Sequence, residues 1–178
     1  IDLYSRSPIR VSVYINTLSI LFLFPAIIGM GLLLREKSPA LALHGSIVGI
    51  LGFLCLLIQN TLEAGLISVV MGHEPCATGV PRGSFVVILY NIDQFFMFPA
   101  LILSGVFYLL FGLGFRKLPG LGLWVGSTFL IEVALLLLTM LFFVVQTELP
   151  ASLGIMAQVL ATGITYILAG VMMVRVGR

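Results

Sequence analysis

Residues 59–94 read QNTLEAGLISVVMGHEPCATGVPRGSFVVILYNIDQ, a polar turn between two long apolar runs. Pro and Gly at its centre indicate a loop, which we place at residues 73–83. The flanking apolar runs cover residues 40–72 and 84–115. As a helix, each run would measure about 50 Å, whereas the hydrocarbon core of a bilayer is about 30 Å thick. The stretch therefore predicts an unusually long helical hairpin that sets the position of the whole chain in a bilayer.

The composition indicates a lipid environment. Of the 178 residues, 60% are apolar and only 9% are charged, with a mean hydropathy of +1.21. Soluble domains carry about 25% charged residues, so this chain has too little charge for a water-exposed surface. The net charge of +2, without a basic run, gives no support to a nucleic-acid partner.

The apolar runs predict an all-α integral membrane protein with one transmembrane helical domain over residues 1–178. Its five helices are expected at 11–34, 41–71, 84–115, 120–146 and 151–174. The second and third helices are unusually long for membrane spans. Pro25 should kink the first helix, because proline removes one backbone hydrogen bond and crowds the preceding turn.

The basic residues predict the orientation in the membrane. Six of them fall on one side: Arg35, Lys37, Arg116, Lys117, Arg175 and Arg178. Three fall on the other: Arg6, Arg10 and Arg82. Because basic residues accumulate on the cytoplasmic side, we expect a multi-pass protein of the cell membrane with a cytoplasmic C-terminus and an external 73–83 loop. An external start with two arginines also fits a further segment before Ile1.

Glu132 lies near the middle of the fourth predicted span. A carboxylate at this depth costs several kcal/mol unless it is paired or protonated. No Lys or Arg lies at this depth, and the expected neighbours are the neutral Ser104 and Thr162. We therefore expect the carboxylic acid form. Two roles are open: a proton, cation or quinone site, or a hydrogen bond that joins neighbouring helices.

A polar cluster interrupts the long hairpin: Asn60, Glu63, Asn91, Asp93 and Gln94. Asn60 and Glu63 share one helix face, and Asn91 and Gln94 share another, from which Asp93 is turned away. Counted from the cytoplasmic turns, Asn60 and Asp93 lie at a similar depth near the outer interface. The cluster could line a pocket, bind a cation or take part in acid–base chemistry. The alternative, which we favour, is that polar residues occur here because the helices leave the lipid.

The sequence contains no convincing catalytic or metal-binding motif. HEPC in the loop is not the HExxH of zinc enzymes. His44 and His73 fall on opposite sides of the membrane, which argues against a bis-histidine haem and leaves His44 as a candidate single ligand. The identity of any cofactor stays open, and the balance favours a protein that is not an enzyme.

Three functions follow, in the order in which we favour them. The first is a non-catalytic accessory or scaffold subunit, which contacts other membrane protein subunits through the hairpin, because apolar surface outside the lipid marks an interaction site. The second is a small proton-linked transporter or channel centred on Glu132. The third is a redox subunit that binds a quinone, haem or pigment near His44 and Glu132. A strong tilt would instead draw the hairpin into the lipid and turn the polar cluster into a buried pocket.

Overall fold

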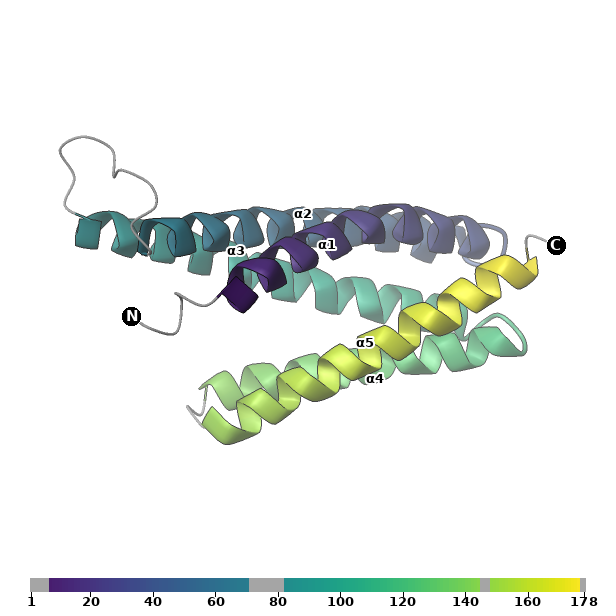
Figure 1. The fold of residues 1–178 in the computed structure, drawn as a ribbon. Helices are drawn as coiled ribbons and strands as arrows, with labels where there is room; N and C mark the ends of the chain where they lie inside the picture. The colour runs from purple at the N-terminus through teal and green to yellow at the C-terminus, as the bar shows by residue number, and fades with distance from the viewer. Residues whose placement is uncertain (1–6, 71–81, 145–147, 177–178) are drawn as a thin grey trace. The chain divides into compact units, whose positions relative to one another are not determined.

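The structure, a computed structural model, describes residues 7–70, 82–144 and 148–176. Side chains are described for residues 15, 17–66, 83–141 and 160–175. Five helices account for nearly all of these residues (Figure 1): α1 (Ser7–Leu34), α2 (Pro39–Val70), α3 (Arg82–Phe115), α4 (Leu121–Val144) and α5 (Glu148–Val176). No strand occurs in the described ranges.

The predicted all-α architecture with five helices is confirmed. Every helix begins and ends within four residues of its predicted position. The two longest helices are α2 and α3, with 32 and 34 residues, as the hairpin predicts. The predicted 73–83 loop is too long at its end, because Arg82 and Gly83 already belong to α3; residues 73–81 lie outside the described part of the chain.

Four helices are long and apolar enough to cross a bilayer: Thr17–Leu34, Pro39–Leu66, Gly83–Phe115 and Leu121–Leu141. The protein is therefore a multi-helix, membrane-embedded protein. In α5 the described apolar stretch is shorter, Leu160–Arg175, so a fifth crossing stays a prediction.

The two short turns follow from local sequence. Pro39 opens α2, a position that suits proline because the first N–H groups of a helix have no carbonyl partner. The backbone carbonyl of Ser38 accepts the N–H of Ala42 at 2.9 Å and so starts the hydrogen-bond series. Before α4, Gly120 has φ of 66°, in the left-handed region that glycine adopts without strain.

Contacts divide the chain into two units. Unit 1 consists of Ile1–Phe24 and Leu51–Ala100, and unit 2 consists of Pro25–Ile50 and Leu101–Arg178. Among the described side chains of unit 1, the buried apolar residues are few: Ile20, Phe53 and Ala100. Unit 2 has the larger core and contains both α4 and α5, which pack against each other. The expectation of a single domain is not tested by this division.

Glycines allow close helix packing inside unit 2. Gly45 and Gly49 of α2, which are four residues apart, face the rings of Phe111 and Phe107 on α3. At Gly49, a Cβ atom would lie 2.6 Å from the Phe107 ring. This interface therefore depends on glycine at residue 49.

One end of unit 2 carries the basic side chains. The α1–α2 turn, the α3–α4 turn and the end of α5 all lie at this end (Figure 1). They hold Arg35, Lys37, Arg116, Lys117 and Arg175, which are all exposed. This grouping agrees with the predicted basic side, although Arg178 lies outside the described residues. That this end is cytoplasmic stays a prediction.

Candidate functional site

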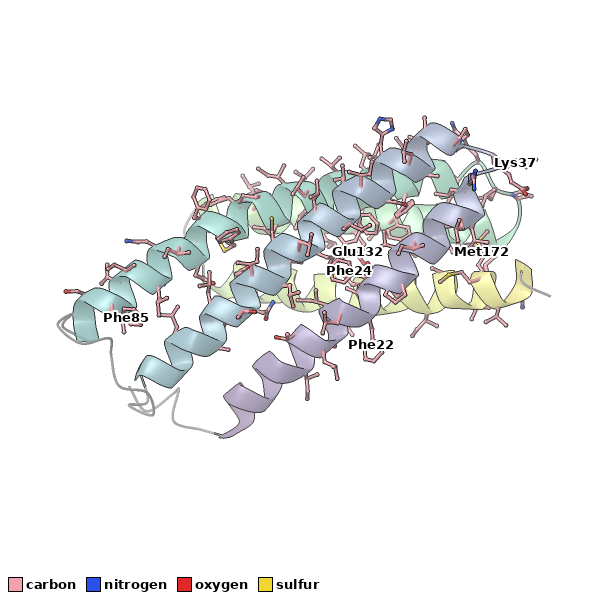
Figure 2. All side chains as sticks on the ribbon, turned by 90° about the horizontal axis from the view of Figure 1, so that it is seen from above. Phe22, Phe24, Lys37, Phe85, Glu132 and Met172 are labelled. Atoms are coloured by element: carbon pink, nitrogen blue, oxygen red, sulfur yellow. The ribbon has the colours of Figure 1, made fainter. Side chains whose placement is uncertain are left out.

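Glu132 lies inside unit 2, at the middle of α4, and is fully buried (Figure 2). The Thr162 hydroxyl of α5 donates to Oε2 of Glu132 at 2.8 Å. The Thr165 hydroxyl lies 3.4 Å from Oε1. Thr162 and Thr165 are three residues apart, so they share the helix face that meets α4. The expected proximity of Glu132 and Thr162 is confirmed, whereas Thr165 was not anticipated.

The hydrogen atoms of this cluster can be assigned. The Thr165 hydroxyl donates to the carbonyl oxygen of Ala161 at 2.9 Å, and a hydroxyl has only one hydrogen. The contact between Thr165 and Glu132 is therefore best made by a glutamic acid that donates to Thr165. Tyr108 of α3 also bonds to Thr162, whose own hydrogen goes to Glu132. The resulting row of bonds can be completed with a neutral Glu132, whose protonation stays a prediction.

Aromatic rings pack against this row of bonds on the side that is predicted to face the cytoplasm. Phe129, one turn before Glu132 on α4, is fully buried. Its ring centroid lies 5.8 to 6.4 Å from those of five other aromatic side chains: Phe107, Tyr108, Phe111, Phe115 and Tyr166. Such ring pairs add to packing energy and keep water away from the polar row.

Three buried hydroxyls of unit 2 have no hydrogen-bond partner among the described residues. One is the Oγ atom of Ser38 in the α1–α2 turn, and the other two are the Oγ atom of Ser104 on α3 and the Oη atom of Tyr166 on α5. Ser104 was expected beside Glu132, but its hydroxyl takes no part in the row. Tyr166 is close enough to Glu132 and Tyr108 for electrostatic interaction. Of these hydroxyls, that of Tyr166 is thus a polar group close to Glu132 that is unpartnered within the described part of the chain.

The polar cluster of the hairpin lies in unit 1 and is only partly brought together. Asp93 is buried, with 8% of its surface exposed, and Asn60 is buried on α2, where its amide donates to the carbonyl of Leu56 at 2.9 Å. Gln94 donates to Oδ2 of Asp93 at 3.3 Å, whereas Oδ1 has no partner among the described residues. Glu63 is exposed on α2 but close enough for its charge to act on Asp93.

The remaining candidates lie apart from these groups. Asn91 is exposed on α3. His44 is exposed on α2, and its Nδ1 donates to the carbonyl of Ala40 at 2.7 Å. Because Glu132 is fully buried, His44 does not share an enclosed pocket with it, and its role as a cofactor ligand stays a prediction. The described residues contain no group of three or more His, Cys, Asp or Glu side chains that could hold a metal.

Comparisons with protein-family models, with curated proteins and with solved structures find no match to this chain. The functional assignment therefore rests on the chemistry of two polar regions. One is the closed row around Glu132 in unit 2. The other is the pair of acids in unit 1, Glu63 and Asp93; the side chains described for that unit include no Lys, Arg or His.

Proposed function

We propose that the protein is a non-catalytic accessory subunit of a larger membrane complex. The observation that carries this proposal is the length of α2 and α3, 32 and 34 residues, combined with apolar exposure near the start of α3. At 1.5 Å per residue these helices measure about 50 Å, roughly 20 Å more than the hydrocarbon core. Three side chains near the start of α3 form what we call the outer patch: Val87, Ile88 and Tyr90, exposed by 58%, 50% and 55%.

The outer patch is suited to another protein rather than to water. Counted along the helix from Phe115, Val87 lies about 42 Å away, beyond a hydrocarbon layer of about 30 Å. Large apolar side chains exposed at such a position mark an interaction surface. Tyr90 adds a hydroxyl to an apolar ring, a combination that is enriched in protein interfaces.

The row around Glu132 supports a non-catalytic role. Both oxygens of the carboxyl group meet hydroxyls of α5, so this acid is used to hold α4 against α5. A midplane acid that is satisfied by two neighbouring side chains is typical of helix packing. The residue that could have carried transport chemistry thus has a structural use.

The test compares aspartate with leucine at the same two positions of the outer patch. Val87→Asp with Ile88→Asp should release the partner from the complex extracted in mild detergent, measured as a fall in complex mass. Val87→Leu with Ile88→Leu keeps the apolar surface and should retain the complex. The isolated subunit should insert and fold equally well in both variants. A chain that fails to insert or fold with the two aspartates places the patch in lipid and defeats the proposal, as does an unchanged complex.

A proton-linked carrier is the second candidate, favoured by one observation. The bonds from Tyr108 through Thr162 to Glu132 form a continuous row along which a proton can pass. In reconstituted vesicles, Glu132→Gln should then abolish proton flux while leaving the fold intact. An accessory subunit predicts no flux in either protein.

A further inference from the structure

The buried acid of unit 1, Asp93, differs from Glu132 because no described residue pairs with one of its carboxyl oxygens. Asp93 is buried, yet its Oδ1 has no hydrogen-bond partner among the described residues. Its Oδ2 has only the 3.3 Å bond from the adjacent Gln94. Buried carboxylate oxygens in proteins are normally bonded, paired or coordinated to a metal. Oδ1 of Asp93 can therefore bind a group that the described part of the chain does not supply.

The charge around Asp93 indicates the sign of that group. Glu63 of α2 is exposed, but it lies close enough to Asp93 of α3 for the two charges to interact. The described side chains of unit 1 include no Lys, Arg or His. Two like charges at one place repel each other unless a cation lies between them.

The available atoms indicate the kind of cation. The cluster offers two carboxylates and the amide groups of Asn60 and Gln94, all oxygen donors of the kind that calcium prefers. Calcium accepts amide carbonyls and water beside carboxylates, in flexible geometry. The exposure of Glu63 gives water access to the remaining coordination positions.

The position along the helices also suits a soluble ion. Counted from Pro39, Asn60 lies about 32 Å along α2, and counted from Phe115, Asp93 lies about 33 Å along α3. Both distances just exceed the roughly 30 Å of the hydrocarbon core. The cluster therefore lies at the membrane interface, where an ion from water can reach it.

We propose that Asn60, Glu63, Asp93 and Gln94 form a calcium site that bridges α2 and α3 within unit 1. With only two carboxylates and with water completing the shell, affinity should resemble that of weak extracellular modules, about 0.1 to 1 mM. Bound calcium holds the two helices together, so it stabilises unit 1 whether or not a partner subunit is bound. The site is independent of the accessory role.

The experiment uses the full chain in uncharged detergent with Cys76→Ser as background. Cys55 lies half-buried in unit 1, so a thiol-reactive dye reports when this unit opens on heating. Calcium chloride should raise the melting temperature saturably, with a half-effect at about 0.1 to 1 mM. Asp93→Asn should abolish this rise. Glu63→Gln should increase the calcium concentration of half-effect at least tenfold. Glu36→Gln, an exposed acid in the α1–α2 turn of unit 2, should leave the calcium response unchanged.

Three results would overturn the calcium site. One is the absence of a saturable rise in the unsubstituted chain. Another is an equal rise with magnesium chloride at the same concentrations, which would indicate general screening. The third is an Asp93→Asn variant that responds as the parent does. If that variant does not fold, Glu63→Gln decides the question, because an unchanged calcium concentration of half-effect in Glu63→Gln would also contradict the calcium site.

Discussion

Replacing Glu132 with leucine should weaken the pairing of α4 with α5 by about 1 kcal/mol. The loss comes from two contacts with α5, the 2.8 Å bond from Thr162 and the longer contact with Thr165. Hydrogen bonds between membrane helices contribute about 0.6 kcal/mol on average and about 1.7 at most. The 3.4 Å contact is the weaker of the two, because bond strength falls beyond about 3.2 Å.

The cost of leucine stays small because Thr162 has an alternative. A threonine inside a helix can donate to the carbonyl four residues earlier, as Thr139 does to Leu135 at 2.8 Å. Glu132→Gln should be nearly silent, because the amide can accept from Thr162 and donate to Thr165. If the side chain were instead needed as a titrating group, Gln would abolish activity without affecting stability.

Equilibrium unfolding in mixed micelles measures these differences. Glu132→Leu and Thr162→Val remove the same bond, so the double variant should lose about 0.6 kcal/mol less than the sum of the two single losses. Thr139→Val is the matched control, because that hydroxyl bonds only within its own helix. Strict additivity would show that the bond contributes nothing. A loss above about 3 kcal/mol for Glu132→Leu would exceed what interhelical hydrogen bonds supply. It would refute the estimate that only two contacts with α5 are lost.

Two further predictions concern packing and orientation. Gly49→Leu should destabilise the fold by about 1 to 3 kcal/mol, because its Cβ would meet the fully buried Phe107 ring. Gly65→Leu should not destabilise it, since nothing lies within 4 Å of a Cβ at residue 65. Thermal unfolding compares the two variants, and equal melting temperatures would contradict the packing of Gly49 against Phe107. Single cysteines at the positions of Lys117 and Arg178 should react with an impermeant thiol reagent only from the cytoplasmic side, and reaction from outside alone would reverse the orientation.

Depth in the membrane could be predicted from the sequence, but direction around a helix could not. Each residue adds 1.5 Å, so Thr162 was correctly placed at the level of Glu132. Ser104 was placed at the same level by the same count, yet its hydroxyl has no partner among the described residues. The rotation of α3 and α5 about their axes depends on packing that no single helix encodes, since lipid and protein faces are equally apolar. Thr165 was missed for this reason, although its spacing from Thr162 was a usable signal.

In the hairpin, too, the spacing of residues could be predicted from the sequence, but the buried face of the helix could not. Spacing correctly separated Asp93 from Asn91, and the structure buries the first and exposes the second. The sequence did not say which of these two faces of α3 would be buried, because the apolar residues surround the helix. It also could not show that Oδ1 of Asp93 lacks a partner, which depends on the positions of side chains from α2.

The two acids that are buried among the described residues, Glu132 and Asp93, lead to opposite predictions about stability. Glu132 is satisfied by α5, so replacing it with an apolar side chain should cost stability. Asp93 leaves one oxygen unsatisfied, and such a buried group costs about 1 to 3 kcal/mol. Asp93→Leu should therefore raise the free energy of unfolding by about that amount in calcium-free buffer, because the unsatisfied group is removed rather than its partner. Calcium should stabilise the unsubstituted chain and have no effect on the leucine variant. The difference between their free energies of unfolding should therefore narrow as calcium is added. Chemical unfolding with and without calcium measures the effect of the substitution and the effect of calcium on the free energy of unfolding. An Asp93→Leu variant that is less stable than its parent without calcium would mean that this carboxyl group already has its partners within the chain, and the reason for placing a cation there would be gone.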